Sequence, residues 1–136
     1  MVEEALFAIL TTDAPLSALV SNRIYPNKLP QNVTYPAIAY RQVAELTQTM
    51  FEPPGTNGQV AVRFRFFSVS EEREQFGYTE AKRIDEALRV ALVGKYGTFS
   101  GVEIQGIFLE SVAADDYEDT TETYQVIRDF TVYAVR

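Results

Sequence analysis

The stretch that most limits the fold is residues 60–70, "VAVRFRFFSVS". Its even positions from 60 to 66 are apolar, whereas Arg63 and Arg65 stand between them. Because side chains alternate between the two faces of a strand, this pattern predicts a strand with one buried and one solvated face. Two arginines on one strand face also suit a phosphate site, but the acidic balance of the chain favours the solvated face.

Three further strands and a long helix are expected around this segment. Residues 37–43 alternate in the same way, and segments 102–114 and 123–136 complete the strands. Between the second and third strands, apolar residues recur every three or four positions, as in an amphipathic helix. Ser70 is the predicted cap of that helix, glutamates follow it in the first turn, and Gly94 is the predicted end.

The N-terminal part predicts a short helix, a break and a second helical turn. Residues 2–11 have apolar side chains at helical spacing, and Asp13 is placed to cap a turn that tolerates Pro15. The element order is therefore helix, strand, strand, helix, strand, strand. It predicts a single α+β domain over residues 1–136, with a largely antiparallel four-stranded sheet. A short N-terminal helix and one long helix are expected on one side of the sheet. The sequence allows either the third or the fourth strand to pair with the second strand.

The segment "VSNRIYPNKLPQNVTYPAIAY", residues 20–40, joins the helical turn to the first strand. Its three prolines favour extended backbone, and Tyr25 and Tyr35 each precede a proline. Rings on extended backbone can lie against the edge of a core while their hydroxyls stay wet. A strap across the end of the sheet explains both tyrosines, and a partner-binding role is the alternative.

The composition excludes several classes of protein. The 136 residues include no cysteine and no histidine, which removes disulfides, thiolate chemistry and the commonest general base. A net charge of −7 disfavours specific nucleic-acid binding, which depends on neutralising phosphates. Two glutamates near the N-terminus and the lack of a long apolar run argue against a signal peptide or a membrane span. We expect no cofactor and no metal site.

Two connections have unusual composition. Residues 45–59 contain Met50 and Phe51 in a stretch rich in proline and glycine, too long for a tight hairpin. Either these two side chains fold back onto the sheet or a partner buries them.

The second connection, residues 114–122, contains four clustered carboxylates: Asp115, Asp116, Glu118 and Asp119. A solvated hairpin tip is the expected structure, because the segment lacks the central glycine and flanking helices of a calcium loop. A carboxylate enzyme would need these groups in a cleft, so we expect no catalysis.

The chain resembles the tail completion, or tail terminator, proteins of long-tailed bacteriophages and prophages. The resemblance is carried by "LSALV" at 16–20, "RIYP" at 23–26, "LPQ" at 29–31 and "YPAI" at 35–38, followed by the long helix and a last strand of the type "YQVIRDFTVYA". It covers nearly the whole chain in order and length.

The resemblance implies a structural virion protein without catalytic residues. It would close the tail tube as a ring, a hexamer in this family, and join the tail to the filled head, with the tail tube protein and a head-completion or connector protein as partners. It would be assembled in the bacterial cytoplasm and end in the virion tail. The acidic segment would then face the lumen or the head-docking surface. A small-molecule or peptide-binding α+β domain is the competing interpretation.

Overall fold

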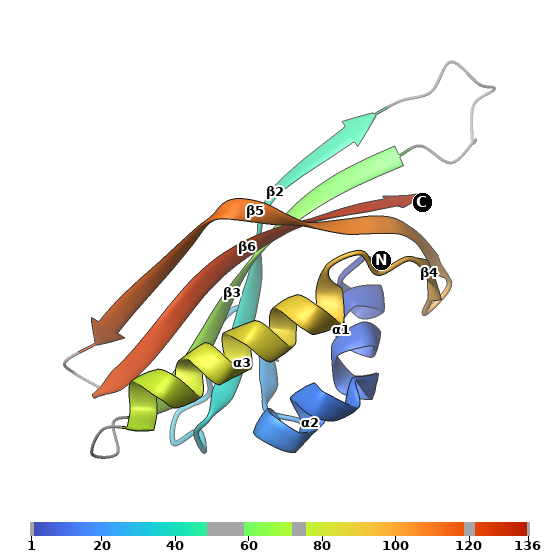
Figure 1. Ribbon diagram of the computed structural model, residues 1–136. Coiled ribbons are helices and arrows are strands. Elements are labelled where there is room, and N and C mark those ends of the chain that lie inside the picture. Colours follow the sequence, from blue (N-terminus) through green and yellow to red (C-terminus); the bar gives the residue numbers. More distant parts are fainter. Residues whose placement is uncertain (1, 49–58, 72–75, 119–121, 136) are drawn as a thin grey trace.

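The computed structural model describes residues 2–48, 59–71, 76–118 and 122–135 (Figure 1). Within these residues the elements follow in the order α1 (Val2–Thr12), α2 (Ala14–Val20), β1 (Ile24–Pro26), β2 (Ala37–Gln48), β3 (Gln59–Glu71), α3 (Phe76–Leu92), β4 (Gly97–Phe99), β5 (Val102–Glu118) and β6 (Thr123–Val135). The described helices lie on one side of a strongly curved sheet, as Figure 1 shows. The mixed α+β class expected from the sequence is confirmed.

The sheet has six strands in the described residues, in the order β1-β2-β3-β6-β5-β4, so the expected number of four is wrong. The four long strands are those predicted, and β6 is the strand that pairs with β3. The two additional strands are three-residue edge strands. β1 runs parallel to β2 inside the proline-rich segment, and β4 pairs with the start of β5. A three-residue strand is too short to show a periodic sequence pattern. It forms because a neighbouring strand supplies its hydrogen bonds.

The helices also differ from the expectation of one short and one long helix, because the described chain contains three. The break between α1 and α2 is at Asp13, whose side chain accepts a hydrogen bond from the Leu16 amide at 3.1 Å, as predicted. The start of α3 was predicted wrongly. β3 continues through Ser70 to Glu71, and the Ser70 hydroxyl donates to Glu80 on α3 at 2.8 Å. Strand pairing with β6 along its whole length overrides the local capping signal.

The core lies between the helices and the face of the sheet that carries the even-numbered residues of β3. Phe66 is fully buried, stacks on Tyr40 of β2 at 5.7 Å between ring centroids, and meets Phe130 of β6 edge-on at 5.5 Å. Leu6 and Leu88 bring α1 and α3 onto the same cluster. The alternation of residues 60–66 therefore identified the buried face correctly.

One ion pair joins α3 to this core. Asp85 of α3 accepts two hydrogen bonds from the Arg128 guanidinium of β6, both at 2.7 Å. Only 5% of the Asp85 side chain and 17% of the Arg128 side chain are exposed. A buried charge strongly destabilises the fold when its partner is removed. The pair therefore holds α3 in one position on the sheet.

Removal of one member of this pair should therefore lower the stability of the fold. We expect Asp85→Ala to lower the free energy of unfolding by about 3–5 kcal/mol, because Arg128 is left buried without its partner. The double variant Asp85→Leu with Arg128→Met should recover most of that loss. Urea denaturation measures both. Glu86→Ala is the matched control on the next residue, where the ion pair with Arg89 is solvent-exposed, and it should leave stability nearly unchanged. A small loss for Asp85→Ala would contradict the assigned role.

Candidate interaction surfaces

The face of the sheet that carries no helix exposes an aromatic pair. Phe108 of β5 and Tyr133 of β6 pack edge-on with ring centroids 5.5 Å apart, yet 58% of Phe108 and 44% of Tyr133 remain exposed. Gly106 lies beneath Phe108, where an added Cβ would approach the ring to 3.0 Å. The glycine thus allows the ring to lie close over the strand. Exposed aromatic side chains on a sheet face are typical of protein interaction sites.

Ion pairs border the aromatic pair on the same face. Arg65 of β3 makes two bonds to Asp129 of β6, at 2.9 and 3.2 Å. Arg63 lies 3.5 Å from Glu110 of β5, which also accepts a hydrogen bond from the Thr131 hydroxyl. The arginine side chains are 38% and 47% exposed, so the predicted solvated face is confirmed, although both arginines are paired. We name Phe108, Tyr133, Arg63 and Arg65 the aromatic face.

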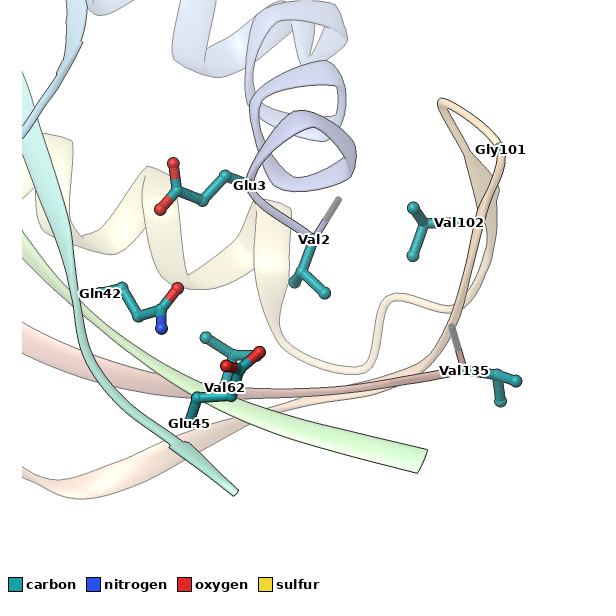
Figure 2. A pocket seen from close by; sticks show the side chains of 8 residues that line it. All are labelled: Val2, Glu3, Gln42, Glu45, Val62, Gly101, Val102 and Val135. Carbon is teal, nitrogen blue, oxygen red and sulfur yellow. The ribbon is translucent and has the colours of Figure 1, made fainter. Parts of the chain in front are cut away.

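A hollow of about 450 Å³ lies on the opposite side of the sheet, between α1, β2 and the turn from β4 to β5 (Figure 2). Valine side chains form much of its wall, and Glu3, Gln42 and Glu45 supply the polar lining. Gln42 and Glu45 share a face only because β2 has a bulge between Gln42 and Ala44. The bulge adds one residue and turns Glu45 to the helix side, opposite Val62. Sequence periodicity alone had not indicated this.

A second hollow of about 710 Å³ follows the exposed side of α1, and we name it the α1 groove. It is lined by Glu3, Glu4, Phe7, Ala8, Thr11, Ile24, Pro26, Tyr40 and Ser100. Phe7 is 39% exposed in it. Burial, together with the nearby Glu3 carboxylate, raises the pKa of Tyr40 above its ordinary value.

The proline-rich connector is tied at both ends. The Arg23 guanidinium donates to the Pro36 carbonyl at 2.8 Å, and the Asn27 amide donates to the Tyr40 carbonyl at 2.7 Å. The intervening residues border a hollow of about 490 Å³ over the helix-free face, near Phe67 and Thr123. The connector is therefore a strap across this end of the sheet, as the prolines indicated.

The two tyrosines singled out in the connector are both half-buried. Tyr25 lies in β1 opposite Ala39, and Tyr35 lines the hollow beneath the strap. A partner-binding role for either remains a prediction.

The acidic segment is more structured than a solvated tip. Asp115 and Asp116 belong to β5, opposite Val126 and Gln125 of β6. Asp115 accepts a hydrogen bond from the Tyr78 hydroxyl at 2.9 Å and pairs with Lys82 at 2.8 Å, both on α3.

The remaining predicted residues add little to this cluster. Asp116 accepts from the Tyr117 amide, and Glu118 ends β5 with only its backbone described. Asp119, Met50 and Phe51 lie outside the described residues. Their proposed roles stay predictions.

Residues 2–48, 59–71, 76–118 and 122–135 contain no group of three acidic side chains that could hold a metal ion. No helix among these residues is long and apolar enough to span a bilayer. Two of the surfaces described above expose aromatic side chains suited to protein contacts: the aromatic face, with Phe108 and Tyr133, and the α1 groove, with Phe7.

The fold thus defines an α+β protein built around a curved sheet with helices on one side. A sequence model of the family described as tail completion protein gp17 matches residues 4–134, nearly the whole chain. The chain belongs to this family, which has a structural role in bacteriophage tails. The resemblance inferred from the sequence motifs is confirmed.

A solved structure shares the fold. A chain from the virion of a native gene transfer agent particle superposes with a TM-score of 0.73, over 97% of this chain and 92% of that chain, at 19% sequence identity. At that identity the likeness concerns the fold. A comparison with curated proteins gave no match.

The cluster around Asp115 generates a pH prediction. The hydrogen bond from Lys82 is the main reason that the pKa of Asp115 lies below its usual range, and the Tyr78 hydroxyl adds to it. A carboxyl with a lowered folded-state pKa stabilises the fold above about pH 4, and that stabilisation is lost as the pH falls through the folded-state pKa. Because both partners are about 40% exposed, we expect less than about 1 kcal/mol.

The comparison of wild type with Asp115→Asn in urea tests this. The wild type should be more stable at pH 7, and the difference should vanish near pH 2. Lys82→Met should reduce the same pH-dependent difference, because it removes the cation. A constant difference between wild type and Asp115→Asn across this range would contradict the assignment.

Proposed function

We propose that this protein terminates the bacteriophage tail tube as a ring of identical subunits and presents the surface that joins the tail to the filled head. The family match over residues 4–134 carries the proposal. The fold shared with a chain of a virion particle is consistent with it. The exposed aromatic pair supports the proposal, because exposed aromatic side chains that lie together on a sheet face often mark a site of protein contact.

The proposed ring determines the expected partners and location. The tail tube protein would contact one side of the ring and a head-completion or connector protein the other, in a virion tail assembled in the bacterial cytoplasm. The proposal includes no catalysis and no cofactor. A monomer in dilute solution is compatible with it, because binding to the end of the tube can supply the free energy that closes the ring. A six-subunit ring matches the tail symmetry that the family resemblance implies.

The acidic segment has a narrower proposed role than the sequence indicated. A negative wall in a channel that conducts DNA prevents the duplex from adhering. Because Lys82 already pairs with Asp115, such a collar would rest on Asp116 and on its neighbours toward residue 122. Changing Asp116, Glu118 and Asp119 together to lysine should slow DNA delivery by otherwise intact particles. A normal delivery rate would remove the collar from the proposal.

The main proposal is tested on isolated tail tubes. Tagged protein added to tubes that lack it should bind at one end only, as seen by negative-stain electron microscopy with a gold label. Class averages of that end should show six-fold symmetry. Binding along the tube wall, or no binding, would contradict tail termination.

The connection containing Met50 and Phe51 is proposed to contact a neighbour or the tube. Replacing both residues with serine should leave the urea midpoint of the isolated subunit within the error of the wild type, yet lower the fraction of capped tubes. A sharp loss of stability with normal capping by the folded fraction would show that both side chains belong to the core.

A further inference from the structure

Both outer edges of the sheet are only partly covered within the described chain. At one edge β1 pairs with residues 38–40 of β2, although β2 continues well past them. At the other edge β4 pairs with residues 102–104 of β5, and Figure 1 shows β5 extending far beyond β4. The Gly94 amide covers one more position, because it donates to the Ile107 carbonyl at 3.0 Å. Among the described residues, no strand pairs with the remaining outer edge of either β2 or β5.

The main chain at these edges points outward at alternate residues. The Ile38 amide and the Tyr40 carbonyl form hydrogen bonds to the residues that flank β1, at 2.9 and 2.7 Å, so both groups face away from β3. Alternation along the strand gives the main chain of Gln42 the same direction. In β5 the Ile107 carbonyl faces away from β6 in the same way. Outward amides and carbonyls on an edge strand are a template to which another strand can be added.

The two open stretches match in length and direction. Residues 41–47 of β2 fill six positions of the ladder, because one residue is bulged. The regular distal half of β5, residues 113–118, also fills six positions. Three successive antiparallel pairings separate β2 from β5, so these strands run in opposite directions. A second copy in the same orientation would therefore present its β2 antiparallel to β5, with the helices of both copies on one side of the joined sheet.

One charged pair favours a second copy as the occupant of the β5 edge. The exposed Arg41 guanidinium lies over the Phe67 ring at 5.5 Å and makes no ion pair with a described carboxylate. Asp116 of β5 lies on the same helix-free face and accepts a hydrogen bond from the Tyr117 amide at 2.9 Å. When the two stretches pair, Asp116 of one copy lies diagonally across from Arg41 of the next, within reach of an arginine side chain.

The same pairing places Glu45 of one copy opposite Asp115 of the next. Asp115 already pairs with Lys82 of α3 at 2.8 Å. Glu45 would therefore meet an ion pair, and the repulsion between the two carboxylates would be offset by the lysine.

We propose that residues 113–118 of β5 in one subunit pair with residues 41–47 of β2 in a second copy of this chain. The Tyr117 amide would then donate to the Gln42 carbonyl, and Asp116 would turn to Arg41 of the neighbour. This inference rests on the ring that we propose above and names its subunit boundary. Because Arg41 would neutralise Asp116, the acidic collar would be left to the neighbours of Asp116 toward residue 122.

The short strands β1 and β4 determine the stagger between neighbouring copies. They cover opposite ends of the two edges, so residues 113–118 can reach only the part of β2 beyond β1. The required stagger is about six residues, or about 20 Å along the strands. The four long strands between the two edges span about 19 Å across the sheet. This stagger tilts the strands by about 45° to the axis of the assembly, close to the tilt of about 35–45° in closed barrels, so repeated pairing is compatible with a ring.

The first experiment uses the absence of cysteine in the chain. Ala44→Cys and Asp116→Cys would face each other across the boundary at a position where Cα atoms lie about 4.5 Å apart, within disulfide range. Within one subunit their strands are separated by β3 and β6, so a disulfide must join two subunits. Oxidation of the tube-bound variant with copper phenanthroline should give a ladder of linked subunits, up to the closed ring, on a non-reducing gel.

The matched control for this experiment combines Ala44→Cys with Glu103→Cys. Glu103 is exposed on the same face of β5, but it lies beside β4 and outside the proposed boundary. The control should give no ladder.

The second experiment exchanges the charges of the proposed pair. Arg41→Glu should lower the affinity for tube ends about fivefold, because the new carboxylate faces Asp116 of the neighbour. Asp116→Arg should have a similar effect, and the two changes in one chain should restore the affinity to within about twofold of wild type. Arg83→Glu makes the same charge change at an exposed position of α3 and should bind like the wild type. Urea denaturation checks that each variant folds.

The outcomes separate this inference from the proposed function. If the wild type caps tubes but the Ala44 and Asp116 cysteines give no ladder, or the charge exchange does not restore binding, the ring stands and this boundary is wrong. A ladder of equal strength from the control pair would also overturn the boundary. A band that links this chain to a tube subunit would assign the strand edge to the tube and contradict pairing between copies. If the wild type does not cap tubes, tail termination itself fails, and this inference fails with it.

Discussion

The pairing of β3 with β6 is the interaction on which the rest of the structure depends. Thirteen residues of each strand pair in unbroken register, from Gln59 opposite Val135 to Glu71 opposite Thr123. The pairing joins segments about sixty residues apart in the sequence, and the loop entropy that it costs must be offset by burial on the helix side. Phe64 and Phe66 of β3 and Phe130 of β6 provide that burial. Because β2 and β5 attach to the outer edges of this pair, its register determines the position of every other strand.

Two irregularities convert this regular framework into distinct surfaces. The bulge in β2 turns Glu45 to the helix side, where it lines the hollow beside Glu3. In β5 the register shifts between Leu109 and Ala113, and the strand then continues to Asp115, beside α3. Bulges bend a strand and increase its twist, which accords with the strong curvature of β5 in Figure 1. The acidic segment thereby contacts Tyr78 and Lys82, and part of its charge is neutralised within the subunit.

For a structural component of a phage tail, rigidity at the subunit level has a direct benefit. The buried ion pair between Asp85 and Arg128 holds α3 on the sheet, and the tied connector fixes the opposite face near Phe67. Neither feature performs chemistry. Both limit the relative motion of elements that carry surface residues, and a contact repeated around a ring would accumulate any such motion.

The sequence by itself determined the four long strands, the capped break at Asp13, the buried face of β3 and the phage tail family, since periodicity, capping residues and motifs are local properties. Tertiary structure alone decided the three-residue strands β1 and β4, the extension of β3 through Ser70, and the position of Asp115 beside Lys82. It also decided which exposed residues come together: Phe108 and Tyr133 are distant in the sequence, as are Glu3 and Glu45. The physical reason is that these features depend on hydrogen bonds and contacts between segments that are distant in the sequence. Which residues contact each other is determined only by the pairing of the strands.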